Sequence, residues 1–340
     1  MATGILAPMP DTRVVLSALA LVGCGGRAPG LTLTMVDSSV KRPSNVAVYF
    51  AVDTDEGEPV PGLTAESFRI YEDGNLVSQH ESKQTILNPE IAAAHYTVLL
   101  IDMSGSVTES GDLPTVSAGA GTFADQVGQY QEIAVYAFDG RKEIVQLSGF
   151  SKDKDGIHRG IERLDSFQSR DPSTNLNGAV QQALVVLDRQ LQRSSVPLRF
   201  GTLVVFTDGT DHAGRVVKDD LYDAIDKSPH DVFVIGVGDE INEDELSAIG
   251  RDGTVLSKNR ADIASSFEQA AARVEAATKR YYLLGYCSPA RAGSHEVTVE
   301  ASWQKRSGSL SYEFNADGFR APCDPNQPPA FRIKGRVRSP

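Results

Sequence analysis

Apolar and polar residues alternate with a regular rhythm through the middle of the chain. Short apolar runs take turns with longer segments whose apolar residues recur at helical spacing. The runs predict strands at Tyr96–Ile101, Ile133–Phe138, Glu143–Leu147, Thr202–Phe206, Val232–Val237 and Thr254–Leu256. The clearest helical segments are Ile157–Leu164, Gly178–Leu191, Leu221–Ser228, Glu243–Ile249 and Ile263–Ala276. This order predicts an α/β fold, a doubly wound and mostly parallel sheet with helices on both faces.

The segments on either side of this block have the pattern of β-strands. Val46–Val52 and Phe68–Glu72 precede it, and Tyr281–Tyr286, Glu296–Ala301 and Leu310–Phe314 follow it. We therefore predict that an α/β domain, residues 94–280, is inserted into a small all-β sandwich module made of residues 45–93 and 281–316. Residues 317–340 contain several prolines and a basic excess, which predicts a solvated tail. Contact of this tail with anionic lipid or a cell-wall polymer is the alternative.

The N-terminal segment has the layout of an export signal. Arg13 is followed by the apolar run Val14–Val22, then by Gly23 and Cys24, which is the length of a signal peptide over residues 1–23. Leu21-Val22-Gly23-Cys24 resembles the lipobox of bacterial lipoproteins. The resemblance implies that the thiol of Cys24 carries a lipid, which would hold the protein on a membrane without a spanning helix. A buried N-terminal helix is the alternative.

Two consequences follow from this reading of the N-terminus. Residues 24–44 contain Gly, Pro and Ser with little pattern, so we predict a tether between the lipid and the folded part. Gly25 stands where enteric lipoproteins retained in the inner membrane have Asp, which favours the outer membrane or the cell surface.

Export also bears on the other two cysteines, Cys287 and Cys323. Compartments beyond the inner membrane are oxidising and permit disulfides. We predict that the two cysteines pair; two free buried thiols are the alternative.

Length and charge exclude some classes of protein. The chain has 340 residues, of which 41% are hydrophobic, enough for a full core and about two domains. Forty-five acidic residues against 33 basic ones give a formal charge of −12, which argues against a nucleic-acid partner. No apolar run reaches the roughly 18–20 residues that span a bilayer, so the chain is not a multi-pass membrane protein.

Polar residues with metal-binding chemistry follow two of the predicted strands. Tyr96–Ile101 runs directly into Asp102-Met103-Ser104-Gly105-Ser106, and Thr202–Phe206 is followed by Thr207 and Asp208. Thr174 lies in a polar loop that leads into the predicted helix Gly178–Leu191. Because ligands of open α/β sheets bind outside the carboxyl ends of the strands, we expect these side chains to meet there.

Asp102, Ser104, Ser106, Thr174 and Asp208 match, position by position, the metal-ion-dependent adhesion site of von Willebrand factor A domains. The resemblance extends over about residues 96–279. It implies a Mg²⁺ ion, replaceable by Mn²⁺ or Ca²⁺, held by these five residues. Their hard oxygen donors suit Mg²⁺ independently of the family. A metal-free cluster whose hydroxyls cap a helix is the alternative.

The charges of this ligand set bear on what the ion could do. Three neutral hydroxyls and two carboxylates leave a divalent ion without excess negative charge, so it can accept an Asp or Glu carboxylate from a partner. We expect a non-enzymatic, lipid-anchored envelope protein that binds a protein ligand in this way, as in adhesion. One alternative is a metal-dependent hydrolase that uses the same ion with His212 as base. Another is an assembly factor of the kind that works with ATPase motors.

Two partial matches to other families are better explained by local structure. The stretch Ser151–Gly156 with Glu162 resembles a calcium-binding loop, but Ser151 replaces the first Asp, so helix capping is favoured. Val46–Val52 followed by Asp53 resembles the nucleophile strand of haloacid-dehalogenase-like phosphatases. No companion motif follows, so a β-turn is favoured there.

Overall fold

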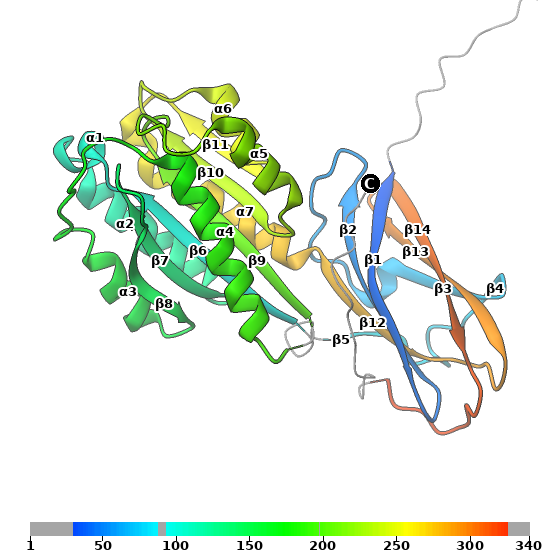
Figure 1. Ribbon diagram of the computed structural model, residues 1–340. Helices are drawn as coiled ribbons and strands as arrows, with labels where there is room; N and C mark the ends of the chain where they lie inside the picture. Colours follow the sequence, from blue (N-terminus) through cyan, green and yellow to red (C-terminus); the bar gives the residue numbers. More distant parts are fainter. Residues whose placement is uncertain (1–29, 88–92, 197, 326–340) are drawn as a thin grey trace, which may run out of the picture.

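One mostly parallel, six-stranded sheet organises the middle of the chain in the computed structural model, which describes residues 30–87, 93–196 and 198–325 (Figure 1). Its order is β11-β10-β9-β6-β7-β8, and all neighbours are parallel except β7 and β8. The strands are β6 (Ala93–Asp102), β7 (Glu132–Phe138), β8 (Val145–Ser151), β9 (Leu198–Thr207), β10 (Asp231–Val237) and β11 (Gly253–Ser257). Long runs of β6, β7, β9 and β10 are buried without alternation, as expected when both faces are covered. The α/β fold class predicted from the sequence is confirmed.

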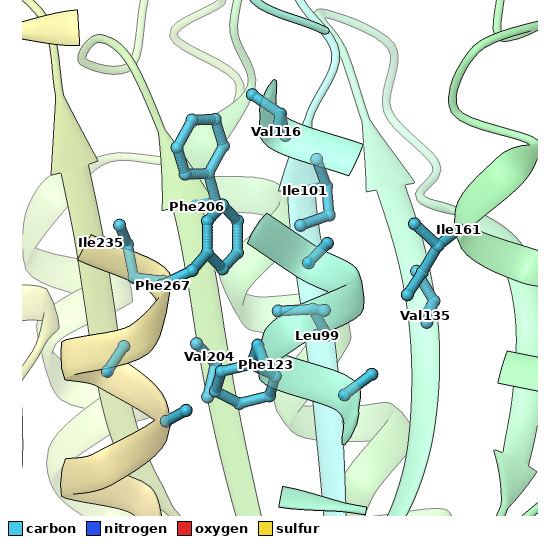
Figure 2. Close-up of a cluster of buried hydrophobic side chains, with 14 of the residues drawn as sticks. Leu99, Ile101, Val116, Phe123, Val135, Ile161, Val204, Phe206, Ile235 and Phe267 are labelled. Atoms are coloured by element: carbon cyan, nitrogen blue, oxygen red, sulfur yellow. The ribbon is translucent and has the colours of Figure 1, made fainter. Parts of the chain in front are cut away.

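Helices cover both faces of this sheet. On one face, α2 (Leu113–Val127), α3 (Lys154–Glu162) and α7 (Ile263–Lys279) enclose the core shown in Figure 2, where Phe206 stacks on Phe267 at a centroid distance of 5.2 Å. On the other face lie α4 (Leu176–Arg193), α5 (Lys218–Lys227) and α6 (Glu243–Ile249). Gly119 of α2 faces the Phe267 ring so closely that a Cβ there would meet the ring at 2.4 Å. Among the described residues, no helix is long and apolar enough to cross a membrane.

Strands from before and after the α/β segment share two antiparallel sheets, with orders β1-β2-β12-β5 and β14-β13-β3-β4. They are β1 (Leu31–Lys41), β2 (Asn45–Thr54), β3 (Phe68–Glu72), β4 (Asn75–Leu76), β5 (Thr85–Leu87), β12 (Tyr281–Cys287), β13 (Ser294–Trp303) and β14 (Arg306–Asn315). One hydrophobic cluster contains residues of both sheets, among them Phe50, Phe68 and Tyr282. We call these strands and their loops the β module.

Two of the predicted segment boundaries are wrong. Most of the expected tether is strand β1, which pairs with β2 from Leu31↔Thr54 to Lys41↔Asn45. Its signal is the alternation Leu31-Thr32-Leu33-Thr34, which the Gly and Pro residues nearby obscure. The expected tail also begins too early, because Phe319 is buried against the core of the β module and the backbone N–H of Arg320 donates to the carbonyl of Pro43.

Smaller differences concern elements with weak local patterns. The strand expected at Glu143–Leu147 is β8, shifted to Val145–Ser151. Helix α2 was not among the predicted helices, because its glycines, including Gly119 and Gly121, weaken the helical signal. The signal peptide and Cys24 lie outside the described residues.

The amino-terminal edge of the six-stranded sheet packs against the β module through aromatic rings. Phe200 of β9 lies 4.6 Å from Tyr281 and 4.9 Å from His95, measured between ring centroids. Tyr49 of β2 stacks on Tyr281 at 5.8 Å. At the same junction, the guanidinium of Arg280 lies 3.1 Å from the carboxylate of Asp53 and 3.8 Å from that of Asp231. Two chain crossings and a shared apolar cluster therefore join the modules.

Candidate metal centre

The candidate site lies at the opposite, carboxyl edge of the six-stranded sheet. Asp102 is the last residue of β6, and Asp208 directly follows β9, its neighbour in the sheet. Ser104 is the N-cap of the short helix α1 (Gly105–Glu109), and Ser106 lies in its first turn. Thr174 lies two residues before α4 begins at Leu176. Parallel strands of this length end at one edge, which is why residues so far apart in sequence meet.

A chain of hydrogen bonds links four of the five residues. The backbone N–H of Ser104 donates to Oδ1 of Asp102 at 2.9 Å. The hydroxyl oxygens of Ser104 and Ser106 are 3.2 Å apart, and the hydroxyl of Ser106 donates to Oδ1 of Asp208 at 2.8 Å. The two carboxylates are thus connected through the backbone N–H of Ser104 and the hydroxyls of Ser104 and Ser106.

Thr174 reaches the same edge through its loop. The backbone N–H of Gly105 donates to the carbonyl of Pro172 at 2.9 Å, so the loop lies directly against the start of α1. A Cβ at Gly105 would meet the Cβ of Pro172 at 3.0 Å, so the close approach favours glycine. The carbonyl of Thr174 accepts N–H bonds from His212 and Ala213. In the described structure its hydroxyl does not belong to the hydrogen-bonded chain of the other four residues.

Burial makes the carboxylate of Asp102 expensive as a free anion. Asp102 is 0% and Asp208 2% exposed. Burial first, and the nearby charge of Asp208 second, raise the pKa of Asp102 to about 7. Hydrogen bonds from the hydroxyl of Thr207 and from Ser104 oppose this rise. A cation bound beside Asp102 would favour its ionised form.

The chemistry of the donors fits a hard divalent cation. In the described parts of the chain, no three His, Cys, Asp or Glu side chains gather in a way that could hold a metal. The candidate site has only two carboxylates, and its other donors are hydroxyls. Such an oxygen-only set matches Mg²⁺, Mn²⁺ or Ca²⁺ and lacks the thiolates and imidazoles typical of zinc sites. The five residues fit such an ion, and its chemistry there would be that of a Lewis acid.

Sequence reasoning missed one charged neighbour of this site, Arg260. Its Nη2 lies 2.9 Å from Oδ2 of Asp208, and its Nη1 lies 2.9 Å from Oδ2 of Asp112. Arg260 lies in the loop between β11 and α7, where Asn259 caps the single turn Arg260–Asp262. That local pattern indicates a helix start and nothing more. Only the packing of α7 beside α2 places the guanidinium at the metal centre.

The alternatives weighed from the sequence have identifiable places in the fold. His212 is exposed, and its backbone N–H bonds to Thr174 beside the site. Asp153 of the calcium-loop-like stretch caps α3, its carboxylate accepting the N–H of Gly156, as the capping interpretation predicts. The carboxylate of Asp53, in the phosphatase-like stretch, accepts a hydrogen bond from the guanidinium of Arg280 at the junction.

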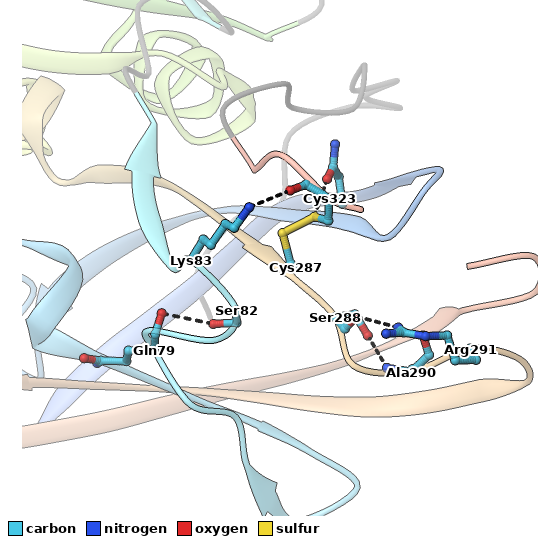
Figure 3. The surroundings of a disulfide bond; sticks show 9 residues. Gln79, Ser82, Lys83, Cys287, Ser288, Ala290, Arg291 and Cys323 are labelled. Carbon is cyan, nitrogen blue, oxygen red and sulfur yellow. Dashed lines mark hydrogen bonds between the residues drawn. A yellow bond between two sulfur atoms is a disulfide. The ribbon is translucent and has the colours of Figure 1, made fainter. Parts of the chain in front are cut away.

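Cys287 and Cys323 are joined by a disulfide in the β module (Figure 3). This is the pairing predicted from the sequence. It attaches the segment after β14 to the end of β12, where Lys83 donates to the carbonyl of Cys323 at 3.1 Å. The disulfide spans 36 residues and lowers the conformational entropy of the unfolded chain. In the chain-entropy account this stabilises the folded protein by about 4 kcal/mol.

Comparison with a family model shows what part of the α/β segment is similar to. Residues 97–210 match the family model of the von Willebrand factor type A domain. This part of the chain is therefore similar to a von Willebrand factor type A domain. The match covers Asp102, Ser104, Ser106, Thr174 and Asp208, whereas Arg260 lies beyond it. No curated protein matches the chain.

Solved structures resemble the chain at low identity. One is a von Willebrand factor type A protein from Catenulispora acidiphila, with 12% identity, a TM-score of 0.44, and 85% of this chain and 74% of that one covered. Another is the manganese-loaded TRAP protein of Plasmodium vivax, with 14% identity, a TM-score of 0.45, and 70% and 98% covered. A third is proximal thread matrix protein 1 of the mussel byssus with a zinc-occupied MIDAS motif, at 15% identity and a TM-score of 0.44. That match covers 54% of this chain and 48% of the mussel chain, so the chain spans about half of the mussel protein's length.

Proposed function

We propose that this protein binds a partner protein through a divalent cation held at the carboxyl edge of its α/β sheet. The observation that carries the proposal is the hydrogen-bonded chain from Asp102 through Ser104 and Ser106 to Asp208. It gathers hydroxyl and carboxylate oxygens at the carboxyl edge of the sheet, where the exposed Ser106 marks the side that a partner can reach. Mg²⁺ is the cation we expect, with Mn²⁺ and Ca²⁺ as possible substitutes.

The ligand set explains why the partner should present an acidic residue. A divalent ion neutralised by only two carboxylates carries no excess negative charge, so a further carboxylate can approach it without repulsion. Ser106 is exposed while Asp102 and Ser104 are buried, which gives the site a deep side and an open side. The partner's Asp or Glu would enter from the open side, and the reaction is binding without catalysis.

We also propose that the protein is lipid-anchored in the cell envelope, in the outer membrane or at the cell surface. The support is the lipobox-like Leu21-Val22-Gly23-Cys24. Radiolabelled palmitate should enter the wild-type protein in cells and be absent from Cys24→Ser. Equal labelling of both proteins would refute the anchor without touching the metal site.

The function is tested by capture of envelope proteins on the immobilised domain-containing chain. Capture should require Mg²⁺ or Mn²⁺, fail with EDTA, and fail with Asp102→Ala. Amidation of carboxyl groups in the extract should abolish it, because the partner then lacks its metal ligand. Asp165→Asn is the matched control, since Asp165 is an exposed carboxylate bonded to Ser117 on the surface. Capture that survives both EDTA and Asp102→Ala would refute the proposal.

A metal-dependent hydrolase is the second candidate, and one observation favours it. The backbone N–H of His212 donates to the carbonyl of Thr174, so this histidine is attached to the loop of a proposed metal ligand. A base there could take a proton from a metal-bound water. Turnover of model esters or phosphates that requires both Mg²⁺ and His212 would support the hydrolase. Turnover that is unchanged in His212→Ala would refute the role of His212 as its base.

A further inference from the structure

Arg260 is a cation beside a site that should itself bind a cation, and its surroundings explain how. The two oxygens of the Asp208 carboxylate have different partners. Oδ1 accepts the hydroxyl of Ser106 at 2.8 Å, and Oδ2 is 2.9 Å from Nη2 of Arg260. The carboxylate therefore cannot rotate without breaking a bond on one side. Its Ser106-facing oxygen is held toward the other metal-ligating side chains.

The charge of Arg260 is balanced from outside the site. Its Nη1 lies 2.9 Å from Oδ2 of Asp112, the residue before α2. Asp112 and Arg260 together carry no net charge, so the pair holds Asp208 without adding a positive charge that would repel an incoming ion. A lone arginine would orient the carboxylate equally well but weaken the attraction for the cation.

The planar fork of arginine suits this task. A guanidinium can bond two carboxylates through two different nitrogens at once, whereas a lysine ammonium is a point charge on a flexible stem. The side chain of Arg260 is 36% exposed and that of Asp112 28%, so the pair lies at the rim while Asp208 is 2% exposed. Removing the pair leaves the apolar core and the strands of the sheet untouched.

We propose that Arg260 and Asp112 form a charge-neutral clamp that positions Asp208 for the divalent ion. This inference rests on the proposed metal site and adds two residues to it, neither of which touches the ion. Arg260 is a positioning residue, and Asp112 neutralises it. Hydrogen-bond partners of metal ligands commonly change metal affinity by about 10- to 100-fold when they are removed.

The experiment measures the dissociation constant for Mn²⁺ by isothermal titration of the full-length protein. Arg260→Gln should weaken binding by about tenfold or more, and Arg260→Lys by less, because it restores the charge but not the fork. Asp112→Asn should also weaken binding, because it exposes the positive charge of Arg260. In the double variant, Asp112→Asn should add nothing to Arg260→Gln, since no charge remains to be neutralised.

Arg251→Gln is the matched control. Arg251 pairs with Asp252 and bonds the carbonyls of Ile225 and His230, and its side chain is exposed to a similar degree, 30%. The Arg251→Gln variant should bind Mn²⁺ with the same affinity as the wild type. Circular dichroism of each metal-free variant separates a lost clamp from a lost fold, and Arg260→Lys serves if Arg260→Gln does not fold.

The outcomes separate the clamp from the metal site itself. Weaker binding in Arg260→Gln with a non-additive double variant supports the clamp. Unchanged or tighter binding in Arg260→Gln, while Asp102→Ala has lost the ion, overturns the clamp and leaves the metal site standing. Absence of binding in the wild type refutes the metal site and the clamp with it.

Discussion

At both edges of the six-stranded sheet an arginine lies between two aspartates, but only one edge has the features of a binding site. At the amino edge, Arg280 lies between Asp53 and Asp231; at the carboxyl edge, Arg260 lies between Asp112 and Asp208. The surroundings differ. Arg280 lies 5.3 Å from the Tyr281 ring and is enclosed by the β module, whereas Asp208 accepts the hydroxyl of Ser106 in the first turn of α1. An Arg–Asp group therefore indicates a functional site only when further ligand atoms and an approach from solvent accompany it.

The largest expected effect is at the amino edge. Arg280→Gln should lower the free energy of unfolding by about 4 kcal/mol, because Asp53 and Asp231 would stay buried without their cation. Urea denaturation measures this loss. The stabilisation by added Mn²⁺ should be the same as in the wild type, since the ion binds at the other edge. Loss of the Mn²⁺ effect in this variant would break the proposed division between the edges.

A second effect at the amino edge depends on pH. Burial against Phe200 and Tyr281 lowers the pKa of His95 from 6.5 to about 4, the charge of Asp231 partly opposing the shift and that of Lys152 adding to it. The unfolded chain binds the proton more tightly, so this contribution to stability is complete above about pH 6.5 and is lost as pH falls toward 4. We expect about 3 kcal/mol over that window. His95→Phe keeps the stacking and should flatten this part of the stability profile; an unchanged profile would contradict the assignment.

The smallest effect has the opposite sign and belongs to the carboxyl edge. The pKa of Asp102 is raised from 3.8 to about 7, so the folded protein holds this proton more tightly than the unfolded chain does. The resulting stabilisation is complete at low pH and is lost as the pH rises from 3.8 through 7. In the absence of metal, Asp102→Asn should therefore stabilise the protein above neutral pH, by about 1 kcal/mol once the altered hydrogen bonds to Thr207 and Ser104 are counted. Thermal unfolding in EDTA at alkaline pH measures this gain. Destabilisation there would mean that Asp102 serves the fold and not a ligand.

Much of the fold could be predicted because its signal is local. The uninterrupted apolar runs of β6, β9 and β10 are the signature of buried parallel strands. Strand β1 was missed because most of its residues are only half-buried, and its pairing with β2 depends on the partner strand and not on its own composition. The buried end of the chain around Phe319 was missed because a pattern dominated by proline and arginine does not show what the segment packs against.

The site divides in the same way. Asp102 and Asp208 could be placed because each ends a predicted strand, and parallel strands bring their carboxyl ends together. Arg260 could not, because it lies in the loop after β11, where the local pattern shows only a helix start and does not relate it to Asp208. The ion pairs of Arg280 could not be predicted either, because its partners Asp53 and Asp231 come from two different modules.

The measurement closest to the central claim is a titration of Mn²⁺ into the wild type, Asp102→Ala and Arg280→Gln. We predict that the wild type and Arg280→Gln each bind one ion with the same affinity, and that Asp102→Ala binds none. Equal binding in wild type and Asp102→Ala, or no binding in the wild type, would contradict a metal centre at the carboxyl edge of the sheet.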